Sequence, residues 1–186
     1  MVDFDLKLEN EEILLRPLRE EDLEKYFQLT SEPDMWRFFT HDLSTIEGLR
    51  VWAKPAFEKE RLQFTVIEKK TQNILGSTAF GNISSRDQRL EIGWTWLGKA
   101  YQGNGINGKV KSLLLNYCFE TLDLERVEFK TDVLNLQARR ALSNINAIEE
   151  GVLRSHTLMT NGRRRDTIYF SILKQEWPYV KRENDW

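Results

Sequence analysis

Three glycines fall within six residues of the chain, in the segment Gln102-Gly103-Asn104-Gly105-Ile106-Asn107-Gly108. Glycine lets the backbone bend so that neighbouring N–H groups converge on one point. The apolar residues that follow are spaced as in a helix, and a helix start adds unpaired donors and a positive dipole end. The segment therefore predicts an anion-binding loop, of the kind that holds phosphates.

Two phosphate-binding motifs compete for this loop. Gly103-x-Gly105-x-x-Gly108 matches the dinucleotide fingerprint, with Asp132 at a plausible distance downstream, but that fingerprint directly follows a strand in a parallel βαβ unit. Here residues 98–102 intervene and the preceding strands are expected to be antiparallel. A triphosphate-binding P-loop needs Ser or Thr where Val110 stands. An NAD(P)-dependent oxidoreductase therefore stays open as an alternative, whereas the P-loop fails.

Composition narrows the protein class further. The 186 residues are 40% hydrophobic and 30% charged, as in one globular domain spanning 1–186, and no apolar run is long enough for a membrane span or a secretory signal. We therefore expect a cytoplasmic protein. Cys118, the single cysteine, excludes an intrachain disulfide and is expected in the core. The two histidines, His41 and His156, are far apart, so no metal is expected.

Hydrophobic periodicity predicts a mixed α/β chain. Apolar residues at helical spacing predict helices over 20–29, 45–60, 105–121 and 136–145. Strands are predicted over 13–16, 62–68, 74–83, 89–97, 126–133, 149–158 and 166–173. Short polar separators, including Asn161-Gly162, predict antiparallel neighbours. The expected fold is a single mixed, mostly antiparallel twisted sheet flanked by helices, ending in a hairpin.

Simple alternation along the predicted strand 89–97 makes a specific prediction about its two faces. Glu91, Gly93 and Thr95 are expected on one face. The bulky residues Ile92, Trp94 and Trp96 are expected on the other.

The glycine loop resembles the pyrophosphate loop of the GNAT acetyltransferases, Gln/Arg-x-x-Gly-x-Gly/Ala, with Asn107 at the last position. The resemblance runs from residue 16 to 177, and Asn at that position is common in the ribosomal-protein N-acetyltransferase branch. Matching segments are Arg16-Pro17-Leu18, Glu91-Ile92-Gly93-Trp94, Arg126-Val127-Glu128-Phe129-Lys130, Asn135-Leu136-Gln137-Ala138, Glu150-Gly151-Val152-Leu153-Arg154 and Arg165-Asp166-Thr167. The resemblance implies the GNAT (acyl-CoA N-acyltransferase) fold and transfer of an acetyl group from acetyl-CoA to a primary amine.

The resemblance also implies where acetyl-CoA would bind. Amides of the loop would hold the pyrophosphate, and the pantetheine arm would lie where the strand 89–97 splays from the strand 126–133. Asn135 would hold that arm, and either of two arginines would reach the 3′-phosphate. The implied cofactor-binding residues are Thr95, Trp96, Leu97, Gln102, Gly103, Asn104, Gly105, Ile106, Asn107, Asn135, Arg139 and Arg140.

The chemistry needs a proton acceptor, because only a neutral amine attacks. Glu91 is the preferred base, on the strand where the resembled family often places one, and His156 is the alternative because it is uncharged near neutral pH. Relatives often carry a tyrosine as general acid seven residues after the Asn. Leu142 stands there, which leaves a non-catalytic acyl-CoA-binding module open as an alternative.

The acceptor is the least specified part. Trp36, Phe38 and His41 occupy the region of the acceptor wall in the resembled fold, and core packing is the competing interpretation. Residues 1–60 carry 15 acidic and eight basic side chains, which favours a cationic acceptor such as a protein N-terminal α-amine, a polyamine or an aminoglycoside. No nucleic acid or membrane partner is expected, and the chain is expected to be a monomer or homodimer.

Overall fold

The structure is a computed structural model that describes residues 2–186, and it contains one eight-stranded sheet. Its strands are ordered β1-β2-β3-β4-β5-β6-β8-β7. The strands are β1 Leu8–Glu9, β2 Ile13–Pro17, β3 Leu62–Glu68, β4 Ile74–Ser84, β5 Arg89–Leu97, β6 Arg126–Asp132, β7 Ile148–Leu158 and β8 Arg164–Leu173. The mixed, mostly antiparallel sheet predicted from the sequence is confirmed, with β5 and β6 as the parallel pair among the described residues.

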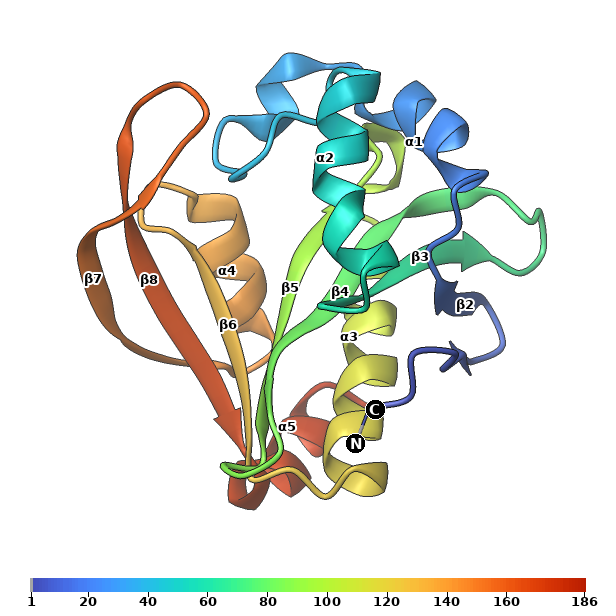
Figure 1. The fold of residues 1–186 in the computed structure, drawn as a ribbon. Helices are drawn as coiled ribbons and strands as arrows, with labels where there is room; N and C mark the ends of the chain where they lie inside the picture. The colour runs from blue at the N-terminus through green and yellow to red at the C-terminus, as the bar shows by residue number, and fades with distance from the viewer. Residues whose placement is uncertain (1) are drawn as a thin grey trace.

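Five α-helices flank the sheet in two groups (Figure 1). Side chains of α1 and α2 pack in a hydrophobic cluster on one face, whereas side chains of α3, α4 and α5 pack in a second cluster on the other. The helices are α1 Asp22–Thr30, α2 Ile46–Phe57, α3 Ile106–Asn116, α4 Leu136–Asn144 and α5 Trp177–Glu183. Short 3₁₀ helices span Pro33–Trp36, Lys99–Tyr101 and Lys174–Glu176, and a short π-helix over Tyr117–Thr121 extends α3.

Local sequence accounts for most of these elements. Thr45 caps α2 by accepting a hydrogen bond from the Gly48 amide at 3.0 Å, and Asn135 caps α4 through the Ala138 amide at 3.1 Å. The expected hairpin is present as β7 and β8, but it does not end the chain, because α5 follows β8. Trp177 of this helix is buried against Phe119, with ring centroids 5.3 Å apart.

The pair β5–β6 holds together at one end only. Pairing is limited to Arg89–Glu91 of β5 with Arg126–Glu128 of β6, although both strands continue further. Beyond this point the two strands diverge, as Figure 1 shows. The main chain of β5 past Glu91 is therefore unpaired on its β6 side, and a gap opens within the sheet.

The predicted alternation along β5 is wrong because a β-bulge interrupts it. Ser77 pairs with Trp96 and Ala79 with Gly93, so two residues of β5 stand opposite one residue of β4. One of them, Trp94, has a left-handed φ of 49°. The bulge puts Trp94 and Trp96 on the cluster of α1 and α2, the opposite face from Ile92.

Candidate active site

The glycine loop has a backbone that requires glycine at two positions. Gly103 and Gly105 have φ values of 76° and 84°, and Gly105 is the N-cap residue of α3. A Cβ atom added at either position would meet no atom within 4 Å. The space in front of the loop is therefore open, as a ligand-binding loop requires.

The main-chain donors of this loop are available. Within residues 2–186, none of the six N–H groups of residues 103–108 has a hydrogen-bond partner, and the first amide to be satisfied is that of Lys109, which donates to Gly105 O at 3.3 Å. Unpaired amides at a helix start are the usual protein site for a phosphate. The loop therefore fits a pyrophosphate, as the sequence predicts.

Gln102 holds this loop against its neighbours. Its Nε2 donates to the carbonyl of Leu97 at the end of β5 at 2.9 Å, and its Oε1 accepts from Gln137 Nε2 of α4 at 3.4 Å. The side chain fixes where the loop stands relative to the open end of the sheet. Asn104 is exposed, and Ile106 and Asn107 are half-buried in the first turn of α3.

The bulge in β5 brings Thr95 to the gap between β5 and β6. Thr95 Oγ1 lies 2.8 Å from Thr78 Oγ1 and accepts a hydrogen bond from Lys111 Nζ of α3 at 3.3 Å. Thr95 therefore faces α3 and not Glu91. The following residues, Trp96 and Leu97, are buried, and neither is paired with β6.

Glu91 is buried at the point where β5 and β6 separate, with 4% of its surface exposed. Its Oε2 accepts a hydrogen bond from Asn82 Nδ2 at 2.6 Å and pairs with Lys130 Nζ at 2.8 Å. Its Oε1 has no partner within residues 2–186. One carboxylate oxygen is thus fixed by two donors and the other is free to accept a proton.

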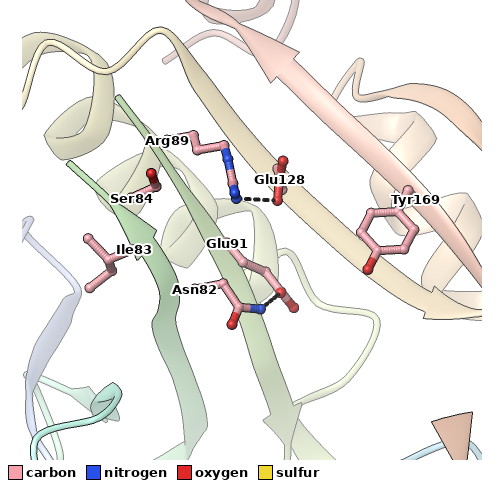
Figure 2. Close-up of a pocket in the computed structure, with 7 residues that line it drawn as sticks. All are labelled: Asn82, Ile83, Ser84, Arg89, Glu91, Glu128 and Tyr169. Atoms are coloured by element: carbon pink, nitrogen blue, oxygen red, sulfur yellow. Dashed lines mark hydrogen bonds and ion pairs between the residues drawn. The ribbon is translucent and has the colours of Figure 1, made fainter. Parts of the chain in front are cut away.

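Glu91 lines an open pocket of about 560 Å³ on the sheet face opposite α3 (Figure 2). Arg89 pairs with Glu128 across the pocket at 3.3 Å, and Tyr169 turns its hydroxyl toward the pocket from β8. The lining residues are Asn82, Ile83, Ser84, Arg89, Glu91, Glu128 and Tyr169. Sequence reasoning named only Glu91 among them, although alternation along β8 places Tyr169 on the face opposite the core residues Ile168 and Phe170.

His156 stands at the side of this pocket and not in it. The residue is exposed on β7, and its Nδ1 lies 3.1 Å from Thr167 Oγ1 and 3.2 Å from Thr157 Oγ1. Its ring packs edge-on against Tyr169, with the centroids 6.1 Å apart. His156 therefore contacts Tyr169, which lines the pocket, but does not line the pocket itself.

A buried cation stands beside the pocket. The guanidinium of Arg61, which is 5% exposed, lies between the rings of Trp52 and Trp94, at 5.3 and 4.8 Å from their centroids. It donates to the Trp52 carbonyl at 2.6 Å. Burial lowers the pKa of Arg61 to about 10, and burial together with Arg61 also lowers the pKa of His41. Sequence reasoning missed Arg61.

The predicted acceptor wall is only partly accessible. Trp36 is a core residue, 4% exposed, with its indole N–H bonded to Thr30 O at 2.8 Å and its ring against Trp96. This packing prevents Trp36 from contacting an acceptor directly. Phe38 and His41 are half-buried and keep accessible surface.

The residues in and near α4 differ in whether their side chains are free to bind a ligand. The Oδ1 of Asn135 is used to cap α4, and its Nδ2 has no partner within residues 2–186. Arg139 donates to Val133 O at 3.1 Å and pairs with Glu149 at 3.5 Å, so it is directed toward β6 and β7. Arg140 is exposed and its side chain forms no hydrogen bond or ion pair in the described part of the chain. Leu142 is buried, and no acid takes its place on α4.

Comparison with known proteins identifies the family. Residues 12–147, well over half of the chain, match the family model described as "Acetyltransferase (GNAT) domain". The chain belongs to the GNAT acetyltransferases. The GNAT family uses acetyl-CoA, and its members among the relatives are N-acetyltransferases.

Relatives of this GNAT enzyme include the Bacillus subtilis protein named "Putative ribosomal N-acetyltransferase YdaF". It is 30% identical over 175 residues, which cover 90% of this chain and 94% of that protein. The crystal structure of a "putative acetyltransferase" from T. thermophilus is 32% identical, with a TM-score of 0.89 over 100% of this chain and 98% of that one. The Vibrio cholerae spermidine N-acetyltransferase in complex with CoA and spermine is 21% identical, with a TM-score of 0.74, covering 92% and 99%, and shares the fold.

The GNAT assignment excludes the NAD(P)-dependent oxidoreductase that the sequence left open. A parallel βαβ unit is present, formed by β5, α3 and β6. However, the 3₁₀ helix Lys99–Tyr101 separates β5 from the glycine loop, whereas the dinucleotide fingerprint directly follows its strand. The GNAT family is also not a family of NAD(P) oxidoreductases. Within residues 2–186 no helix is long and apolar enough to cross a membrane, and no three metal-ligating side chains gather.

Proposed function

We propose that this enzyme transfers the acetyl group of acetyl-CoA to the α-amine of a protein N-terminus, as a ribosomal-protein N-acetyltransferase does. Acetyl-CoA supplies the acetyl group as an activated thioester. The open glycine loop and the unpaired edges of β5 and β6 fit its pyrophosphate and its extended pantetheine arm. The amides of residues 103–107 would hold the pyrophosphate, and Asn135 Nδ2 would bind the arm.

Two further groups complete this proposed binding site. The main chain of residues 95–97 would accept the arm in the manner of an added strand. Arg140, which is exposed, is better placed for the 3′-phosphate than Arg139, which already contacts Val133 O and Glu149.

Glu91 would act as the base in this proposal. Its free Oε1 faces the open pocket, and its Oε2 is held by Asn82 and Lys130, so the carboxylate is oriented before an amine arrives. His156, at the side of the pocket behind Tyr169, remains the second candidate.

The choice of acceptor rests on one observation, the pairing of the carboxylates around the pocket. Glu91 pairs with Lys130, and Glu128 pairs with Arg89 and Arg126. A polyamine or an aminoglycoside carries several positive charges and needs unpaired carboxylates, which this pocket does not offer among the described residues. An α-amine brings a single charge and loses its proton more easily, with a pKa of about 7.7–8.0 against about 10.4 for lysine.

An acceptor panel scored by release of free CoA tests the proposal. We expect peptides with a free α-amine to react faster than the same peptides blocked at the N-terminus with lysines free, and faster than spermidine or kanamycin. The rate should rise with pH across the titration range of the α-amine. Faster turnover of spermidine, kanamycin or the blocked peptide would reject the α-amine and leave the family assignment intact.

A further inference from the structure

Lys111 is a charged side chain on the buried face of α3. It is 4% exposed, and it shares this face with the core residues Leu114, Leu115 and Cys118. An ammonium group in such a place loses its hydration, which opposes folding unless the group is paired and hydrogen-bonded.

The ammonium of Lys111 lies at the gap between β5 and β6. Its Nζ is 3.3 Å from Thr95 Oγ1 of β5 and 5.2 Å from the ring centroid of Phe129 of β6. Both residues lie past the last paired positions, Glu91 and Glu128. Lys111 therefore reaches across the gap from the α3 face, whereas Glu91 lines the pocket on the opposite face.

No carboxylate within residues 2–186 pairs with Lys111 within 4.0 Å. Burial lowers its pKa to about 7, and the Cys118 thiol on its own helical segment and Glu91 on β5 oppose this shift more weakly. Thr95 and Phe129, the other neighbours facing Nζ, are uncharged. The amine is therefore poised between its two protonation states near neutral pH.

One step of the reaction, the protonation of the departing sulfur, has no residue assigned to it so far. When the bond between carbonyl carbon and sulfur breaks, the sulfur departs as a thiolate, and α4 carries Leu142 instead of an acid. The pantetheine arm, as proposed above, runs along the same gap and brings its sulfur between β5 and β6.

We propose that Lys111 is the catalytic residue that protonates the departing sulfur of CoA. This inference rests on the cofactor placement given under the proposed function. Lys111 Nζ gives its proton to the sulfur as the C–S bond breaks, and Glu91 takes the proton that the attacking amine loses. The sulfur leaves as the thiol, Lys111 is left neutral, and each group returns to its starting state by exchange with solvent.

The acid strengths suit this transfer. A thiol of about pKa 8.5 holds a proton more tightly than an ammonium group whose pKa is about 7. Proton transfer from Lys111 to sulfur is therefore downhill. An unburied lysine, at about 10.4, would transfer the proton uphill.

The experiment measures how strongly Lys111 and the sulfur are coupled. Lys111→Met removes the amine at similar volume, and Lys181→Met is the matched control, because Lys181 is a lysine over an aromatic ring on α5, far along the chain. Each protein is titrated by calorimetry with CoA and with desulfo-CoA, which lacks the thiol. We expect the preference for CoA over desulfo-CoA to be about tenfold in the wild type and in Lys181→Met, and to be lost in Lys111→Met.

Two further readouts separate a proton donor from a structural lysine. The thiol of bound CoA, followed by thiolate absorbance, should titrate at least one unit lower on the wild type than on Lys111→Met. The kcat of Lys111→Met should fall about 10²-fold, with the KM for acetyl-CoA changed less than about threefold.

Specific results would overturn the proposal. An equal preference for CoA in wild type and Lys111→Met would do so, as would a normal kcat in Lys111→Met. If Lys111→Met fails to fold, Lys111→Gln replaces it. The wild type alone also provides a test: if the thiol of bound CoA has a pKa no lower than that of free CoA, Lys111 does not protonate the sulfur. These binding measurements use no acceptor amine, so their outcome does not depend on whether the α-amine proposal is correct.

Discussion

Glu91 and Lys111 face the same gap in the sheet from opposite sides. Glu91 opens toward the pocket of Tyr169, and Lys111 extends from α3 to Thr95. In the proposed mechanism, a base on one face and an acid on the other would let an amine and a thioester meet within the sheet without either group occupying the place of the other. The proposed chemistry therefore depends on two residues that lie on different elements.

The proposed role of Glu91 as the base predicts a selective loss of rate. Glu91→Gln keeps the contact with Asn82 but cannot accept a proton, so kcat should fall about 10²–10⁴-fold with little change in the affinity for acetyl-CoA. Steady-state kinetics beside calorimetry with acetyl-CoA checks this. A larger loss in His156→Ala, with Glu91→Gln near wild type, would move the base to His156.

The burial of Lys111 predicts a cost in stability that depends on pH. Its pKa is lowered from 10.5 to about 7, so between these values the unfolded chain binds a proton that the folded chain does not. The penalty is absent above about pH 10.5, grows as the pH falls, and is complete below about pH 7.

Lys111→Met removes this penalty and should therefore unfold at a higher temperature than the wild type at pH 7, by about 2–4 °C for each kcal/mol regained. The difference should shrink toward pH 10. Thermal unfolding across pH 6.5–10 measures it, and a variant that is less stable at pH 7 would show that Lys111 supports the fold.

At the scale of elements, the start of α3 combines two glycines of different kinds. Gly105 has a φ of 84°, which an L-residue rarely adopts, whereas Gly108 has an ordinary helical backbone, and both positions are open. Gly105→Ala should weaken CoA binding at least about tenfold, because it strains the turn that aligns the amides. Gly108→Ala should raise thermal stability, since Ala is favoured in helices by about 0.8–1 kcal/mol, with little effect on CoA binding.

Calorimetry and thermal unfolding of the two variants provide the comparison. Equal losses of CoA affinity in both would mean that any added methyl group obstructs the loop, and that the left-handed turn at Gly105 has no special part in binding.

The elements themselves were largely predictable from the sequence. Strands β3 and β5 were predicted with the bounds that the structure has, because alternation and polar turns are local signals. The bulge was not predictable in this way. The left-handed turn at Trp94 depends on a distant position, since its ring occupies the space over Gly81, where an added Cβ would approach ring carbons to 2.4 Å.

The candidate site was predictable only where a local motif marks it. The glycine loop and Glu91 were found in this way, whereas Lys111 and Arg61 were missed because a charged residue is normally taken as evidence for a solvent-facing position. The signal for Lys111 was its spacing, which is three residues before Leu114 and seven before Cys118, on the buried stripe of α3.

At the scale of the whole molecule, the helices leave part of one sheet face uncovered. Helices α1 and α2 pack over the N-terminal strands, and Figure 1 shows the hairpin of β7 and β8 standing beyond them. The pocket of Glu91 lies on this face, where β4, β5, β6 and β8 contribute its lining. An open approach of this kind suits a flexible chain end better than a small molecule that must be enclosed.

A single peptide can test the proposal that the acetyl group goes to an α-amine. The peptide has a free N-terminus and a single internal lysine, and both nitrogens compete for acetyl-CoA in the same reaction with the wild-type enzyme. Tandem mass spectrometry locates the acetyl group while only part of the peptide has reacted. We predict acetylation at the α-nitrogen, and the same reaction strongly slowed in Glu91→Gln. Acetylation at the lysine Nζ, with the α-amine left free, would contradict the account.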